Sequence, residues 1–291
     1  MSGFATGTWH CRIATCLGYP SKDDPLFRTS AGSADPLAQI DYAAGLGLAG
    51  VDDPFFLRRE PDEQVRMGRA LERTRLEFGS VALAAGQARE PLWGQGSDDA
   101  RDEIDRRLAI AFEALQRVGG RRITLITGFE PLVPRYVQYG ALIDNLRRVV
   151  PQLEKAGVTL YVEPTSDLRI PNLLVNELGD GYLVCKAVDS PNVQLVFDTV
   201  HVQLAHGNLI ENLHAVWDTI GYIQLADNPG RIEPGAGEIN FVSFIEAALN
   251  LGYRGMFALE HGLSVEGQAG EAAALAYLRA IDAAVAQRYA G

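Results

Sequence analysis

The chain has 291 residues, and its 37 acidic against 26 basic side chains give a formal net charge of −11. That balance lacks the basic footprint that phosphate contacts require, so we expect no nucleic-acid partner. With no signal-like N-terminus, no apolar run of ~18 residues and three cysteines outside any CxxC motif, we expect a cytoplasmic protein with reduced thiols and no membrane contact.

Short apolar, β-rich stretches alternate along the chain with longer stretches of helical periodicity, such as Ile104, Leu108, Phe112 and Leu115. This alternation predicts a parallel sheet with right-handed crossovers. Eight repeats, in a length near the ~250 residues that such a barrel typically needs, favour a single (β/α)₈ TIM barrel over residues 1–291. The predicted strands are Arg12–Cys16, Ala49–Asp52, Val81–Ala85, Ile123–Thr127, Thr159–Glu163, Gln194–Asp198, Tyr222–Leu225 and Met256–Glu260.

The connections give the barrel a direction. Helix-to-strand connections are short and carry glycine, which ends helices in the left-handed conformation; they are Leu46–Gly50, Val118–Gly120, Ala156–Gly157 and Leu251–Gly255. Strand-to-helix connections are long, as at an active-site rim. They are Leu17–Asp35, Gly86–Ala100, Gly128–Tyr136, Pro164–Pro171 and Asp227–Asn240.

Four successive strands each end on a side chain that can bind a metal: Glu163, Asp198, Gln224 and Glu260. They are 35, 26 and 36 residues apart, and one β/α unit takes about 30 residues or more. The four side chains should therefore share the catalytic face of the barrel. Each alone could be an ordinary strand-end residue, but the coincidence of four favours a site for one hard divalent cation, Mg²⁺ or Mn²⁺ rather than zinc.

Two further residues lie near these strand ends. His201 follows Asp198 by three residues and either binds substrate or packs at a helix start. Arg231 either binds a substrate oxygen or pairs with Asp227 or Glu233.

The glycine-rich run 234–241 could cradle a phosphate, but it matches no phosphate-loop pattern. A shaped rim loop is the favoured interpretation. Asn240 is the expected N-cap of a helix over Val242–Leu249.

The run from Tyr222 to Phe241, with Gln224 and the segment Pro-Gly-Arg-Ile-Glu-Pro-Gly-Ala-Gly-Glu-Ile-Asn-Phe, resembles the signature of the hydroxypyruvate isomerase family. Glu163-Pro164 and the block from Asp198 to His201, followed by Gly207-Asn208-Leu209, resemble two other parts of that signature. The wider superfamily is the xylose isomerase-like barrel. The match is specific over residues 158 to 262 and weak before them.

The resemblance implies that Glu163, Asp198, Gln224 and Glu260 bind the metal and that Glu163 and Glu260 form the acid/base pair. Gln224 is typical of the isomerase branch, whereas the epimerase branch usually has histidine. Departures from the pattern leave the substrate open, because they lie on the substrate-facing side. They are Ile232 in place of a usual histidine, Arg169 and Asn172 in a usual D-x-P-G run, and Asp52-Asp53 at the end of the second strand.

We therefore expect a metal-dependent aldose–ketose isomerase that acts on a small hydroxy-carbonyl or sugar-like compound. The cation would polarise the carbonyl, while one of Glu163 and Glu260 removes a proton and the other returns one. A ketose 3-epimerase and a sugar dehydratase remain alternatives because they use the same residues. A multi-zinc endonuclease is disfavoured by five histidines that lie mostly off the strand ends, and a non-catalytic sugar-binding barrel by the intact ligand set. A homo-oligomer is compatible with the sequence.

Overall fold

A computed structural model describes residues 8–83 and 87–289, in which strands and helices alternate. The strands are β1 Ile13–Cys16, β2 Gly50–Asp52, β3 Glu77–Phe78, β4 Ser80–Ala82, β5 Arg122–Leu125, β6 Thr159–Val162, β7 Val193–Asp198, β8 Ile220–Leu225 and β9 Phe257–Leu259. The helices are α1 Pro36–Gly45, α2 Pro61–Thr74, α3 Asp98–Val118, α4 Arg135–Ala156, α5 Leu178–Val188, α6 Thr199–Ala205, α7 Leu209–Ala215, α8 Phe241–Asn250 and α9 Gly267–Tyr289, with short 3₁₀ turns at Phe56–Arg58, Leu92–Gly94 and Trp217–Thr219.

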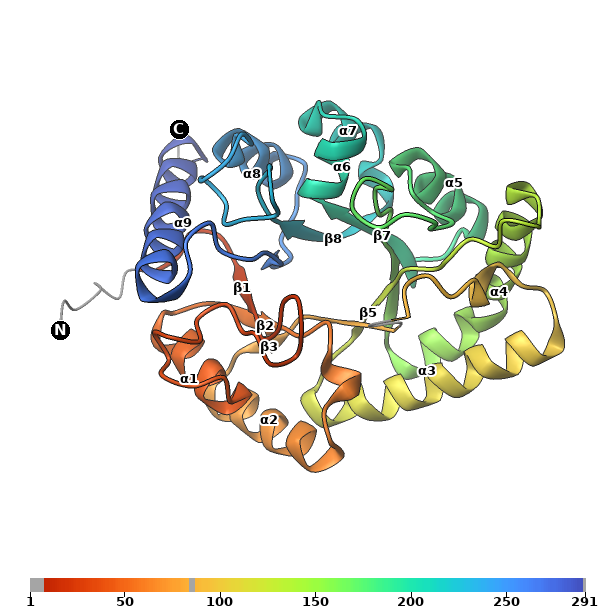
Figure 1. Cartoon of the computed structure of the whole chain (residues 1–291), viewed down its shortest axis with the longest axis horizontal. Coiled ribbons are helices and arrows are strands. Elements are labelled where there is room, and N and C mark those ends of the chain that lie inside the picture. The colour runs from red at the N-terminus through yellow and green to blue at the C-terminus, as the bar shows by residue number, and fades with distance from the viewer. Residues whose placement is uncertain (1–7, 84–86, 290–291) are drawn as a thin grey trace.

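All paired strands are parallel, in the order β3-β2-β1-β9-β8-β7-β6-β5-β4. Only Gly79 separates β3 from β4, so this one segment pairs with β2 through its first half and with β5 through its second half. The ring therefore closes with eight strand positions, and the helices surround it (Figure 1). The predicted (β/α)₈ fold class is confirmed.

The third strand is where the sequence-based prediction was wrong. The prediction was Val81–Ala85, whereas the segment begins at Glu77 and ends at Ala82; Ala84 and Ala85 lie outside the described residues. The start of the strand was missed because it carries Glu77, and glutamate is uncommon in β-strands. The Glu77 carboxylate is paired with Arg12 and Arg122, each at 2.6 Å. The other seven predictions agree with the structure to within two residues at each end.

The helix ends orient the barrel as expected. Gly119 and Gly157 follow α3 and α4 with φ of 63° and 64°, and Gly47 and Gly252 are also left-handed. Asn240 caps α8, since its side chain accepts a hydrogen bond from the Ser243 amide at 3.1 Å. These tight turns lie before the strands, so the long loops gather at the carboxyl ends of the strands.

The barrel interior below that face is filled by side chains of Tyr161, Val196, Tyr222 and Ala258, which form a cluster separate from the main core. The rings of Tyr161 and Tyr222 stack with centroids 5.8 Å apart. The three cysteines are buried and unpaired. Among the described helices, none is long and apolar enough to cross a membrane.

Candidate active site

The four strand-end residues lie on neighbouring strands. Glu163 directly follows β6, and Asp198 is the last residue of β7. Gln224 is the second-last residue of β8, and Glu260 directly follows β9. These strands are consecutive in the sheet, and Asp198 lies beside Gln224 in register. Consequently the topology brings all four to one side of the barrel mouth. We call Glu163, Asp198, Gln224 and Glu260 the acidic site.

Arg231 links two of these carboxylates. Its Nη2 donates to Asp198 Oδ2 at 2.7 Å and lies 3.5 Å from Glu260 Oε1. The Gln224 amide nitrogen donates to the other oxygen of Glu260. Asp198 also caps α6, because its Oδ1 accepts hydrogen bonds from the amides of Val200 and His201 at 2.8 and 3.2 Å. Asp198 is thus held by helix and guanidinium together.

Of the two alternatives for Arg231, the ion pair with Asp227 or Glu233 was wrong. The Asp227 carboxylate instead accepts hydrogen bonds from the backbone amides of Gly235, Gly237 and Ile239 at 2.9–3.0 Å. Glu233 accepts hydrogen bonds from Ser264. The glycine-rich loop is therefore shaped by a carboxylate of its own chain, and the amides that could have cradled a phosphate are occupied.

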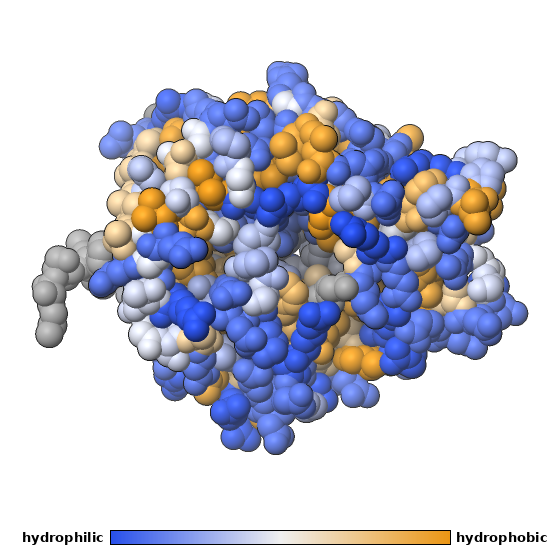
Figure 2. All heavy atoms as spheres, viewed as in Figure 1, coloured by the Kyte–Doolittle hydropathy of each residue, from blue (hydrophilic) through white to orange (hydrophobic). Residues whose placement is uncertain are grey.

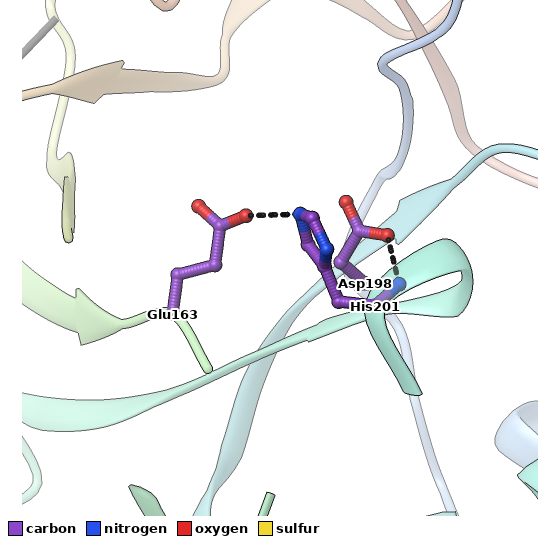
Figure 3. Close-up of side chains that lie close together, drawn as sticks. All are labelled: Glu163, Asp198 and His201. Carbon is purple, nitrogen blue, oxygen red and sulfur yellow. Dashed lines mark hydrogen bonds and ion pairs between the residues drawn. The ribbon is translucent and has the colours of Figure 1, made fainter. Parts of the chain in front are cut away.

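His201 lies in the first turn of α6, which starts directly after β7, rather than in a loop. Its Nε2 is 3.5 Å from Glu163 Oε1 and 3.4 Å from Arg231 Nη1. Figure 3 shows the Glu163 carboxylate pointing at the imidazole ring, with the Asp198 carboxylate close by. The residue is thus both a helix-start histidine, as one interpretation held, and a neighbour of the acidic site.

Burial and mutual repulsion govern the ionisation of these groups. Burial, with the charges of Glu260 and Asp198, raises the pKa of Glu163 well above its usual range. Burial likewise raises the pKa of Glu260 to about 7, although Arg231 opposes the rise. Burial also acts on Asp198, but Arg231 and His201 outweigh it and lower its pKa. Burial lowers the pKa of His201 to about 4, so this histidine is neutral at pH 7.

Asp52 is a neighbour of the acidic site that the sequence analysis noted only as a departure from a family pattern. It lines a cavity of about 40 Å³ together with Glu163, Gln224 and Glu260. Its Oδ1 accepts a hydrogen bond from the Ser80 amide, whereas its buried Oδ2 has no hydrogen-bond partner among the described residues. Burial raises its pKa to about 8. Two consecutive acids at a strand end were the available signal.

The residues present fit a divalent cation. An oxygen of Glu163, an oxygen of Asp198 and a ring nitrogen of His201 all lie within 4.8 Å of one another. The side-chain oxygen of Gln224 is buried without a hydrogen-bond partner among the described residues, although a buried acceptor normally has one. Carboxylate and amide oxygens are the ligands that Mg²⁺ and Mn²⁺ prefer.

A larger pocket of about 380 Å³ adjoins this cavity, since Glu260 lines both. Its other lining residues include Tyr19, from the long loop after β1, and Arg169, from the loop after β6. We call this 380 Å³ pocket the outer pocket. The face seen in Figure 2 is hollowed near its centre. Sequence reasoning placed no role on Tyr19 or Arg169, because nothing local shows that these two loops meet.

Comparison with known proteins agrees with this architecture. The model of the xylose isomerase-like TIM barrel family matches residues 40–281. The chain belongs to this family. It is 28% identical to a hydroxypyruvate isomerase of Escherichia coli (strain K12), over 82% of this chain and 92% of that protein. It is 29% identical to a 2-oxo-tetronate isomerase of Cupriavidus necator, over 71% and 81%.

Solved structures share the fold. A family 2 AP endonuclease from Brucella melitensis superposes with a TM-score of 0.77 and 22% identity, covering 92% of this chain and 99% of that one. A D-psicose 3-epimerase from Clostridium cellulolyticum H10 superposes with a TM-score of 0.72 and 17% identity, over 86% and 94%. At these identities the likeness describes the barrel and not the reaction.

Proposed function

We propose that this protein is a metal-dependent isomerase of a small α-hydroxycarbonyl compound. The observation that carries the proposal is the pair of buried glutamates, Glu163 and Glu260, which line one 40 Å³ cavity at the barrel mouth. An isomerisation of this class moves a proton between neighbouring carbons and needs a proton acceptor and a proton donor, roles that two carboxyl groups can divide. The names of the relatives from Escherichia coli and Cupriavidus necator support the same reaction class.

The acidic site would hold the cation through Glu163, Asp198, Gln224 and Glu260, with His201 beside it. When bound there, Mg²⁺ or Mn²⁺ would polarise the substrate carbonyl and stabilise the negative charge that develops on it. The carboxylates must be ionised to bind the ion, so loading would release the protons that burial now favours.

The protein's own side chains would carry out the proton transfers and hold the substrate. One of Glu163 and Glu260 accepts the proton from a substrate carbon, and the other delivers a proton to the neighbouring carbon, while the proton of the substrate hydroxyl passes to the former carbonyl oxygen. His201 is neutral, so its ring can hydrogen-bond a substrate hydroxyl without adding charge. Arg231 keeps Asp198 ionised.

The test is a panel of three- to six-carbon ketoses and oxo acids, including hydroxypyruvate, assayed with Mn²⁺ in D₂O. We expect an isomer of one panel member that carries deuterium on the carbon that received the proton. Deuterium with inverted configuration at the same carbon would indicate epimerisation instead. Loss of water from the substrate would indicate a dehydratase. No exchange with any member would contradict the proposal.

A further inference from the structure

Tyr19 joins two guanidinium groups at the barrel mouth. Its ring lies 5.4 Å from the guanidinium carbon of Arg231, and its hydroxyl accepts a hydrogen bond from Arg169 Nη2 at 2.5 Å. The loop after β1 thereby meets the loop after β6. Tyr19 and Arg169 both line the outer pocket, which opens onto Glu260.

The two arginines differ in what balances their charge. Arg231 is buried and pairs with Asp198 and Glu260. Arg169 is exposed, and among the described residues its side chain forms no ion pair and donates a hydrogen bond only to the Tyr19 hydroxyl, although its charge also helps to lower the pKa of Glu260. A guanidinium has five N–H donors arranged to hold a carboxylate with two parallel hydrogen bonds. Arg169 is therefore the arginine whose charge and donors remain available to a ligand.

The outer pocket offers a ligand few other polar contacts. Its walls include Pro20, Pro54, Phe55, Ile126 and Ile170. Among the described residues that line it, only Tyr19, Arg169 and Glu260 carry polar side-chain groups. Apolar walls cannot satisfy a row of sugar hydroxyls, and leaving such groups unpaired costs free energy on binding. The pocket thus suits a short substrate with few hydroxyls and one anionic end.

We propose that Arg169, oriented by Tyr19, binds a carboxylate of the ligand in the outer pocket and so selects a short hydroxy-oxo acid over a neutral sugar. The inference rests on the proposed function for its reactive end and extends it to the specificity-determining residue. Arg169 stands where the resembled family pattern has no arginine, so this recognition would belong to this chain rather than to the family at large.

The experiment compares two compounds by calorimetric titration of the Mn²⁺-loaded protein. Hydroxypyruvate and dihydroxyacetone share a hydroxyketone and differ in a carboxylate against a hydroxymethyl group. We expect Arg169→Met to weaken hydroxypyruvate binding about 10- to 100-fold, the usual range for a lost charge-assisted hydrogen bond, and to leave dihydroxyacetone within about twofold. Tyr19→Phe should cause a smaller loss in the same direction. The wild-type preference alone does not test the role of Arg169, because the cation would also attract the carboxylate of hydroxypyruvate. The change in affinity caused by Arg169→Met does test it.

Arg58→Met is the matched control. Arg58 is exposed, lies over the Phe55 ring at 5.9 Å and does not line the outer pocket, so its removal changes the net charge equally. It should leave both affinities unchanged. The inference is overturned if Arg169→Met weakens neither compound or both equally, if Arg58→Met has the same effect, or if the wild type binds neither compound. Arg169-dependent binding without isotope exchange would instead leave the inference standing and remove the isomerase proposal.

Discussion

Two groups of buried acidic side chains lie at the barrel mouth, and they differ in how their carboxylates are paired with positive charge. After β2, Asp53 and Arg59 form an ion pair at 2.5 Å, with side chains 0% and 2% exposed. Arg59 also donates to the carbonyls of Leu17 and Lys22, and Asp53 accepts a hydrogen bond from the Phe55 amide. The guanidinium of Arg59 also lies 3.3 Å from the partly exposed carboxylate of Glu63, so this region pairs its buried charges within the chain. The Asp53–Arg59 pair ties the loop after β1 to the loop after β2.

Across the mouth, the acidic site holds three carboxylates. Those of Asp198 and Glu260 lie 2.7 and 3.5 Å from the guanidinium of Arg231, and that of Glu163 lies 3.5 Å from the ring of His201. His201 adds no charge at neutral pH. Folding gives the Asp53 carboxylate a guanidinium partner within the chain, although burial still raises its pKa. The acidic site has more carboxyl groups than guanidinium partners, and burial raises the pKa of Glu163 and Glu260 there. Buried charges in a structural role are paired. The difference supports the proposal that the acidic site binds a positive ligand, whereas the Asp53–Arg59 pair stabilises the fold.

The largest contrast should appear in activity. Glu163→Gln and Glu260→Gln each keep an oxygen but remove a proton carrier, so kcat on the identified substrate should fall about 10²–10⁴-fold. Glu238→Gln is the control, because Glu238 is an exposed rim residue that accepts a hydrogen bond from Gln203. Metal content must be measured in each variant. An undiminished kcat in fully loaded Glu260→Gln would remove the acid/base assignment.

For the free energy of unfolding, the Asp53–Arg59 pair should matter more than the acidic site. Asp53→Asn leaves the buried Arg59 with only the partly exposed Glu63, at 3.3 Å, as counter-charge; breaking a buried ion pair typically costs about 3–5 kcal/mol. Denaturant unfolding of the metal-free protein measures this loss. Glu163→Gln, made in the acidic site, should instead leave stability unchanged or raise it, because it removes a buried carboxyl group whose ionised form is disfavoured by burial and by the charges of Glu260 and Asp198. If Glu163→Gln destabilised the protein as much as Asp53→Asn, the two regions would be equivalent and the comparison would fail.

How far the sequence alone leads is clear from these same residues. Glu163, Asp198, Gln224 and Glu260 were found because parallel strands end at a common edge, so spacing along the chain predicts proximity in space. Gly119 and Gly157 predicted which connections are the short helix-to-strand ones, because a glycine that ends a helix in the left-handed conformation can be recognised from the local sequence. The partners of Arg231 and the meeting of Tyr19 with Arg169 were not predictable. They depend on how long loops cross the mouth, which no local pattern encodes.

A smaller effect should appear in the pH dependence of the metal-free protein. The pKa values of Glu260, about 7, and Asp52, about 8, lie above those expected in the unfolded chain, as does the raised pKa of Glu163. Above pH 6.5 the unfolded chain therefore binds fewer protons than the folded one, and stability must fall as pH rises. His201 acts oppositely, but only as pH falls from 6.5 towards 4.

We therefore expect the Tm of metal-free protein to drop by about 2–6 °C between pH 6.5 and 8, given roughly 2–4 °C per kcal/mol for chains of this size. Glu163→Gln should flatten this slope, and Mn²⁺ should offset it most at the higher pH, where the ligands lose their protons readily. Thermal melts with and without Mn²⁺ provide the measurement. A Tm that rises over this interval would show that the acids are already compensated.

The central claim, that the acidic site holds a cation, is tested most directly by anomalous diffraction from crystals grown with Mn²⁺. The account predicts one peak per chain at the carboxyl ends of β6 to β9, with oxygens of Glu163, Asp198, Gln224 and Glu260 about 2.0–2.2 Å away. The peak should be absent from Asp198→Asn crystals prepared identically. A fully occupied peak elsewhere, or none among these four side chains, would contradict the account.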